Sequence, residues 1–200
     1  LLESIDPAQT NIILLGDNST PGQAVQAPFG SGNAKGDLYN GGIHVPMVAK
    51  GPAVTLPAGS ETESLVHCID VFATVLELAG VDPDTVPGLD AQNVLSTSMV
   101  PVWNNTDSAD RYVVAERNNE DDEFGRALIL SAYPDYKCSI KGDPDDVTDT
   151  PTFEFYKGDT DQNEQSQTEI NSLTGTAIDD YNACLAKDQA IDSGYSNPAE

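Results

Sequence analysis

Basic residues are scarce in this chain of 200 residues: nine Lys and Arg stand against 33 Asp and Glu, a formal net charge of −24. Nucleic acids and anionic membranes need a positive protein surface, so this balance argues against both as partners. An anionic substrate would be repelled at long range, and a site for one needs a metal ion and a local cation. The acidity suits a salty, extracytoplasmic setting as well as a merely soluble acidic protein.

Long apolar runs and paired cysteine motifs are also absent. No run approaches the roughly 18 to 20 apolar residues of a membrane helix. The first ten residues, LLESIDPAQT, contain neither a basic region nor a cleavage site, and we expect the chain to be a piece of something longer. The three cysteines, Cys68, Cys138 and Cys184, include no C-x-x-C, so they indicate neither a zinc site nor a disulfide framework. Buried thiols and, in an exported protein, one bridged pair both stay open.

A hydrophobic content of 38% is enough for a real core and indicates one domain, with room for a small appendage. The short apolar run Ile12 to Leu15 stops abruptly at Gly16, which predicts a strand buried on both faces of a parallel sheet. Ligands of open α/β sheets lie just beyond the carboxyl ends of such strands. Asp17 and Asn18, which follow directly, are therefore candidate site residues.

A loop of about twenty residues, rich in Gly and Pro, follows this strand and is longer than connectors usually run, which favours a functional loop. Lys35 lies in it, and if the loop folds back over the strand end its ammonium can meet an anionic group. Without further context, the Asp17-Asn18 pair could equally form a simple turn, and Lys35 could be an ordinary solvated lysine. Residues 43 to 49 predict a second strand, interrupted at Pro46.

A helix is predicted over residues 65 to 79 by apolar residues at three- and four-residue spacing, with Gly80 placed to cap its end. Its start has two interpretations. Ser60 and Glu63 fit a capping box, whereas Asp70 fits the N-cap of a shorter helix preceded by a short strand.

After residue 110 the sequence pattern changes to four strand-like runs, which are separated by acidic turns that contain Gly and Pro. This pattern predicts a small antiparallel sheet. The runs are 112 to 116, 127 to 131, 136 to 140 and 153 to 156. A last helix is predicted over 176 to 190, with Ile178, Tyr181, Leu185 and Ala186 facing inward. The expected fold class is α/β, with a sheet core in residues 1–100 and the antiparallel sheet plus helix in residues 101–200.

The chemistry of the candidate site points to a hard cation. Asp17 offers a carboxylate and Asn18 an amide oxygen, which suit Ca²⁺, or less well Mg²⁺, far better than Zn²⁺. Two ligands do not fill a Ca²⁺ site of about six to eight oxygens. The remaining ligands must come from elsewhere.

The order of three motifs resembles the sulfatase family of the alkaline-phosphatase superfamily. They are D-N at 17, K-G-x-L-Y-x-G-G-I-x-V-P from 35, and V-x-x-I-D-V-F-A-T-V-L-E-L-A-G from 66. Later segments resemble the family more loosely, at 88–90, from 125 to 137 and at 153–156, so the likeness covers about residues 10 to 170. Asn40 stands where the family usually has Glu, and His44 where it usually has Arg.

This resemblance implies a sulfuric-ester hydrolase with a mainly parallel sheet flanked by helices. It implies that Asp17 and Asn18 bind a Ca²⁺ that holds the sulfate group, and that Lys35 contacts a sulfate oxygen. His44 is a second catalytic candidate, beside its interpretation as a structural histidine of the sheet. The family's formylglycine nucleophile, made from a C-x-P-S-R-like motif, has no counterpart here, so we expect it in a missing N-terminal half.

The implied substrate is a small or carbohydrate sulfate ester, and the implied location is periplasmic or secreted. Two alternatives stay open. One is a phosphodiesterase or phosphonate hydrolase of the same superfamily, although its two-zinc members typically place Asp-His where this chain has Asp17-Asn18. The other is a non-catalytic acidic module.

Overall fold

The computed structural model describes residues 5–26, 30, 32–82, 85–87, 95–118, 124–141, 152–157 and 172–195. The chain forms two compact units. The first unit comprises Leu1–Gly16 and Pro46–Arg111, and the second comprises Asp17–Val45 and Tyr112–Glu200. The predicted division into residues 1–100 and 101–200 stays a prediction about domains, and the two units are described in turn.

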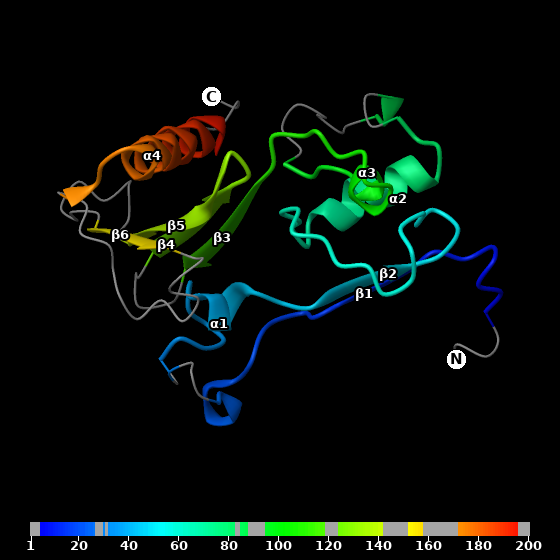
Figure 1. The fold of residues 1–200 in the computed structure, drawn as a ribbon, viewed down its shortest axis with the longest axis horizontal. Coiled ribbons are helices and arrows are strands. Elements are labelled where there is room, and N and C mark those ends of the chain that lie inside the picture. The colour runs from blue at the N-terminus through cyan, green and yellow to red at the C-terminus, as the bar shows by residue number, and fades with distance from the viewer. Residues whose placement is uncertain are drawn as a thin grey trace. The chain divides into compact units, whose positions relative to one another are not determined.

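The first unit contains a two-stranded sheet and two helices (Figure 1). Its elements are β1 (Ile12–Leu15), β2 (Met47–Lys50), α2 (Asp70–Leu78) and α3 (Val100–Trp103). Strands β1 and β2 pair antiparallel, from Ile12 opposite Lys50 to Leu15 opposite Met47. One face of the pair packs against a small core of Met99, Val102 and Trp103.

The parallel sheet expected around β1 is not present among the described residues, because the one neighbour of β1 there runs antiparallel to it. The strand itself is confirmed, but its burial on both faces was wrong. Leu14 is 68% exposed and Val48, directly opposite on β2, is 59% exposed. Alternation sends Ile13 and Ala49 toward the core and leaves the other face of this short sheet open.

Helix α2 is the shorter of the two predicted helices, but Asp70 is its first residue rather than its N-cap, which is Ile69. A carboxylate oxygen of Asp70 accepts the His67 N–H at 2.9 Å and the other accepts the Thr97 N–H at 2.8 Å. The residues before it, 61–67, form no strand. Gly80 adopts φ +68° just past the helix end, as predicted for a capping glycine.

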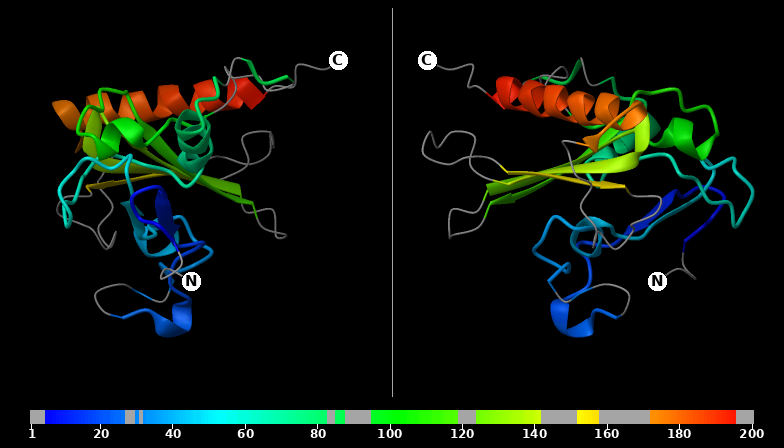
Figure 2. Two further views of the ribbon diagram at one scale, coloured as in Figure 1. Left: turned by 90° about the vertical axis from the view of Figure 1, so that its right-hand side faces the viewer. Right: turned by 60° about the vertical axis from the view of Figure 1, so that its left-hand side comes forward.

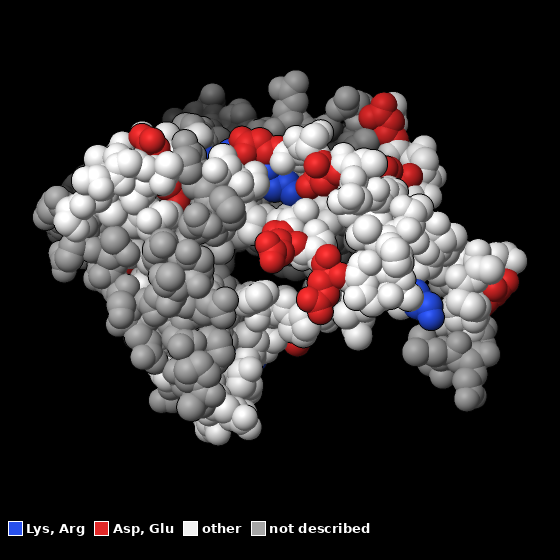
Figure 3. Space-filling model, viewed as in Figure 1, with Lys and Arg blue, Asp and Glu red and all other residues white. Residues whose placement is uncertain are grey.

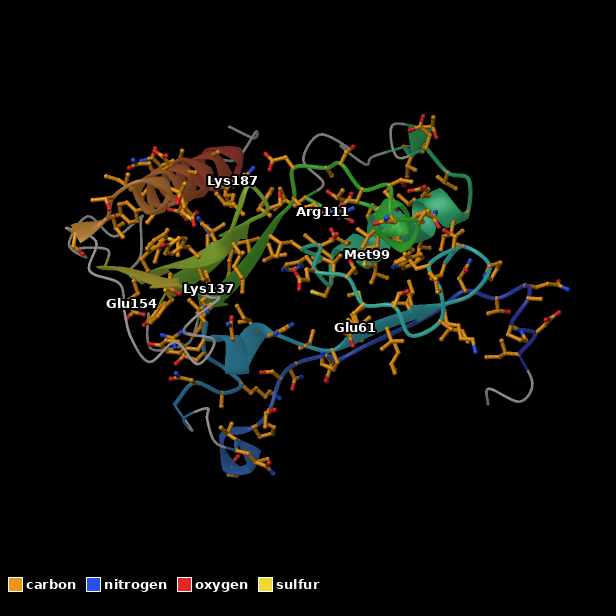
Figure 4. The ribbon with its side chains drawn as sticks, in the orientation of Figure 1. Glu61, Met99, Arg111, Lys137, Glu154 and Lys187 are labelled. Atoms are coloured by element: carbon orange, nitrogen blue, oxygen red, sulfur yellow. The ribbon has the colours of Figure 1, made fainter. Side chains whose placement is uncertain are left out.

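Arg111 ties this part of the first unit together (Figure 4). Its guanidinium makes a two-pronged contact with the Asp107 carboxylate at 2.7 and 3.1 Å and lies 3.6 Å from Asp70. It also donates to the Ser98 carbonyl. A buried guanidinium with several oxygen partners is stable, whereas an unpaired one would be costly.

The second unit is built on the four-stranded antiparallel sheet that the sequence predicted, in the order β3-β4-β5-β6. The strands are β3 (Tyr112–Asn118), β4 (Phe124–Leu130), β5 (Tyr133–Lys141) and β6 (Thr152–Lys157). The unit also holds the 3₁₀ turn η2 (Gly22–Ala24), α1 (Asn40–Ile43) and α4 (Thr176–Tyr195). Figures 1 and 2 show α4 along one face of this sheet and α1 toward the other.

The core of the second unit lies between α4 and the sheet. Leu128, Cys138 and Phe155 are fully buried there. The predicted inward face of α4 is confirmed in part, since Tyr181 packs against this core. Ile178 is 42% exposed and Ala186 is exposed, whereas Ala177, Cys184 and Ile191 are buried. The sequence misled here since the inward face also carries a buried acid, Asp180.

Both buried cysteines of the second unit, Cys138 on β5 and Cys184 on α4, are free thiols in this core, and Cys68 is an exposed free thiol of the first unit. A hydrogen bond to Cys138 and burial raise the pKa of the Cys184 thiol well above its ordinary value. These two thiols therefore act as small apolar core groups rather than as nucleophiles.

Acidic side chains are scattered over the described surface in Figure 3 and basic ones are sparse, in keeping with the charge of −24. Within the described ranges, no helix is both long and apolar enough to cross a membrane.

Candidate functional site

Asp17 and Asn18 begin the second unit, directly after Gly16 and the end of β1. Both side chains are exposed. A carboxylate oxygen of Asp17 accepts the Asn18 N–H at 3.0 Å, a local turn contact that leaves the other carboxylate oxygen and the Asn18 amide facing solvent. Two hard oxygen donors are thus presented side by side at the point where the strand ends.

The long loop after Asn18 folds back on its own first residues. The Lys35 N–H donates to the Thr20 carbonyl at 2.9 Å, which brings the backbone of Lys35 to within two residues of Asn18. The Ser19 hydroxyl donates to the Gly41 carbonyl. The segment 17–20 is therefore held from two directions, by the lysine turn and by the start of α1.

Lys35 is exposed at the tip of a tight turn. Ala34 before it is buried at 4% exposure, its carbonyl accepts the Asp37 N–H at 3.1 Å, and Gly36 adopts φ +96°. A positive φ of this kind favours glycine, so the K-G pair fits the turn. The turn fixes its own backbone and leaves the ammonium free to reach an anion.

The segment after this turn corrects the predicted strand over residues 43 to 49, because Ile43 ends a helical turn and residues 44–46 belong to no helix or strand. Residues Asn40–Ile43 form the one-turn helix α1, and β2 starts only at Met47. Gly42 explains why: a Cβ there would lie 2.1 Å from the Asp37 carbonyl oxygen and 2.6 Å from that of Ala34. Only glycine allows the chain to curl this tightly beneath the lysine turn.

His44 follows α1 and is exposed rather than part of a strand. Its backbone N–H donates to the Asn40 carbonyl at 2.9 Å. Within the described part of the chain, no hydrogen bond joins its ring to Asp17, Asn18 or Lys35. Its catalytic role stays a prediction.

Sequence reasoning missed the side chains by which the sheet holds this loop. On β5, Lys137 is 2% exposed and its Nζ donates to the Leu38 carbonyl at 2.8 Å. On β3, Arg117 lies 3.5 Å from the Asp37 carboxylate. No local signal marks Lys137 as buried, because Lys137 and Ser139 alternate with Cys138 and Ile140 as the polar face of a strand does.

Tyr39, next to Leu38, contacts the outer strand of the sheet. Its ring lies edge-on to Tyr156, with centroids 6.0 Å apart, and its hydroxyl donates to a Glu154 carboxylate oxygen at 3.4 Å. The Tyr156 hydroxyl donates to the same oxygen at 3.0 Å. Burial, assisted by Tyr39 and Glu154, raises the pKa of Tyr156 above its ordinary value, so this phenol stays a neutral donor.

The donor set fits part of a Ca²⁺ site. Asp17 and Asn18 supply hard oxygens of the kind that Ca²⁺ prefers, but not the roughly six to eight oxygens of a full shell. Among the described residues, no group of three or more His, Cys, Asp and Glu side chains could hold a metal ion. The D-G-like segment at 88–90 and the loop over 158–171 lie outside the described residues.

Comparison with known proteins gives two partial matches, both to sulfatases. A sulfatase of Formosa agariphila is 44% identical over 46 residues, which are 23% of this chain and 8% of that protein. Arylsulfatase K of Xenopus laevis is 32% identical over 65 residues, which are 32% of this chain and 12% of that protein. No family model matches the chain. These similarities support a relationship to sulfatases, over a small part of the relatives' length.

Proposed function

We propose that this chain is the C-terminal portion of a sulfatase, a sulfuric-ester hydrolase, and that it contributes metal ligands and a sulfate-binding lysine. The nucleophile, expected to be formylglycine, belongs to a missing N-terminal half, so the chain alone should not turn over. The observation that carries the proposal is the hydrogen bond from Lys35 N–H to the Thr20 carbonyl, which brings the backbone of the loop lysine back to within two residues of Asn18. The partial similarity to two sulfatases supports it.

The proposed reaction adds water across the S–O ester bond and gives an alcohol, sulfate and a proton. Lys35 would donate a hydrogen bond to a sulfate oxygen and offset the charge that gathers there as the alcohol leaves. Asp17 and Asn18 would hold a Ca²⁺, with Mg²⁺ fitting less well. When bound, the cation would draw the sulfate group into the site and share its negative charge. His44 is the second catalytic candidate.

Charge supports the need for these cations. A chain with a net charge of −24 repels a sulfate ester, and ions screen that field beyond about 8 Å at physiological strength. Binding therefore depends on charges within a few ångströms of the sulfate, which is where Lys35 and a bound cation would act. The acidity also supports a periplasmic or secreted location. The proposed substrate, a small or carbohydrate sulfate ester, follows from the partial similarity to sulfatases.

The open face of the β1–β2 pair supports the missing half. Leu14 and Val48 are large apolar side chains that lie opposite each other and are more than half exposed. We propose that further strands and helices of the N-terminal half cover them and complete the mainly parallel, sulfatase-like sheet. Strands that are covered on both faces in this way typically have a continuous run of apolar residues, such as the run from Ile12 to Leu15.

The two alternatives make different demands on the same residues. A two-zinc phosphodiesterase or phosphonate hydrolase needs imidazole ligands for its metal ions. The amide of Asn18 instead favours a site for one hard cation. A non-catalytic acidic module would need neither a cation at Asp17 nor the ammonium of Lys35.

The test is a Lys35→Ala substitution in the complete protein, assayed on an aryl sulfate and a sulfated sugar. Loss of one charge-stabilising group predicts a fall in kcat of about a hundredfold or more. Lys50→Ala is the matched control, since Lys50 is also an exposed lysine but lies on β2 of the first unit, and this variant should keep the wild-type activity. Near-normal turnover by Lys35→Ala would contradict the assignment, and activity on phosphate diesters alone would select the first alternative.

A further inference from the structure

We propose that Lys137 is a positioning residue that fixes the Lys35 turn on the four-stranded sheet. The effect of Lys137 on catalysis rests on the proposed function. Its anchoring of the turn rests only on contacts within the second unit. It assigns to the sheet a role as the platform of the candidate site.

The two faces of the sheet carry different partners. Along β5, Cys138 and Ile140 point to the α4 side, where they join the core. Alternation therefore sends Lys137 and Ser139 to the opposite side, toward the segment that holds Lys35. Tyr156, which pairs with Lys137 across β5 and β6, lies on that side too and contacts Tyr39.

Lys137 meets the loop at three consecutive residues, 38 to 40. Its Nζ donates to the Leu38 carbonyl at 2.8 Å, lies 3.4 Å from the Asn40 amide oxygen, and is 5.9 Å from the centre of the Tyr39 ring (Figure 4). The side chain is almost fully buried. Because an ammonium is expensive to bury without hydrogen bonds, these acceptors and the lysine depend on one another.

The surface of the sheet is shaped to receive Leu38. This side chain is 3% exposed, and a Cβ on Gly125 of β4 would lie 2.8 Å from its Cδ1 atom. The absence of a side chain at Gly125 makes the space for Leu38. Arg117, 3.5 Å from Asp37, adds a further contact from β3. The loop is therefore seated by shape as well as by charge.

The seated residues lie next to the lysine turn. The carbonyl that Lys137 binds belongs to Leu38, three residues after Lys35, and the turn between them is closed by the Asp37 N–H on the Ala34 carbonyl. If Leu38 moves, the turn moves with it, and the Lys35 N–H loses its Thr20 partner. A displacement of about 1 Å at a catalytic group can cost a hundredfold in rate. Lys137 would thus act on the sulfate through Lys35 without touching it.

The first experiment is hydrogen exchange on the chain as given, comparing Lys137→Met with Lys137→Arg and Lys187→Met. Lys187 is the matched control because its Nζ lies 3.9 Å from the Tyr112 ring centre, on α4 at the other face of the sheet. We expect Lys137→Met to speed exchange at the Lys35, Asp37 and His44 amides on the order of tenfold and to leave α4 unchanged. Lys187→Met should leave those three amides unchanged, and Lys137→Arg should change them less than Lys137→Met.

Two results would overturn the anchoring role. Unchanged exchange at the Lys35, Asp37 and His44 amides would show that the lysine does not hold the turn. Equal loosening of α4 and of β3 to β5 would show that it only stabilises the unit.

The second experiment measures kcat and KM for the same variants in the complete protein. Lys137→Met should lower kcat roughly tenfold with little change in KM, and Lys137→Arg should restore most of it. Loosened amides with unchanged kcat would contradict the positioning role. If the complete wild-type protein hydrolyses no sulfate ester, the proposed function fails, and the exchange experiment alone then decides whether Lys137 anchors the turn.

Discussion

The two sheets of this protein differ in how their faces are covered. The four-stranded sheet of the second unit has α4 on one face and the lysine-bearing segment 17–45 on the other, and its central side chains, such as Phe155, are fully buried. The two-stranded sheet of the first unit has a core on one face only, and Leu14 on its other face is 68% exposed. The first sheet is thus covered on both faces within its own unit, whereas the second has an exposed apolar face.

This difference indicates where each unit obtains its stability. A sheet with both faces covered buries apolar area on each strand, and each square ångström so removed from water is worth about 25 cal/mol. The β1–β2 pair leaves apolar area on one face exposed to water and so gains less free energy from burial. A two-stranded sheet on its own is only marginally stable. The candidate site begins where the chain passes from the open sheet into the covered one, at Asp17.

The largest expected effect on stability is in the covered sheet. Phe155→Ala removes a fully buried ring that stacks on Tyr136 at 4.7 Å and meets Tyr181 edge-on. We expect a loss of about 3–5 kcal/mol in the unfolding free energy of the second unit. Exchange of β5 amides under native conditions measures it. A loss below about 1 kcal/mol would show that this core is not the main support of the unit.

The four-stranded sheet was predictable because each of its strands is an alternating run bounded by turns, a pattern set by local sequence. The partner direction of β1 was not. A run of four apolar residues indicates a buried strand, but it carries no information about what lies beside it or whether the cover is in this chain. The inward face of α4 was predicted only in part: Tyr181 packs against the core as expected, but nothing in the sequence marks Asp180 as a buried residue.

The candidate site shows the same division. Its candidate residues Asp17, Asn18 and Lys35 are recognisable in the sequence by type and spacing, and their chemistry stays a prediction. The curl at Gly42 and the buried Lys137 could not be predicted, because each depends on contacts between distant segments: Lys137 Nζ and the Leu38 carbonyl are 99 positions apart in the chain. Whether the site binds a cation stays a prediction.

The smallest expected effect is on the open sheet, and it sharpens the comparison. In the chain as given, Leu14→Thr should change the unfolding free energy of the first unit by less than about 0.5 kcal/mol, since the side chain is mostly in water. In the complete protein, where the proposed N-terminal half would cover Leu14, the same substitution should lower the unfolding free energy by about 2 kcal/mol. Thermal unfolding of both forms measures the two values. Equal small effects in both would mean that nothing covers this face.

The most direct test of the central claim is a calorimetric Ca²⁺ titration of this chain alone and then together with the proposed N-terminal half. The account predicts no measurable binding by the chain alone, and binding in the mixture together with the appearance of sulfate-ester hydrolysis. Asp17→Ala should abolish that binding, whereas Glu61→Ala, which removes an exposed acid of the first unit, should not. Absence of Ca²⁺ binding in the mixture would contradict the account, because Asp17-Asn18 would then be a turn and the chain a non-catalytic acidic module.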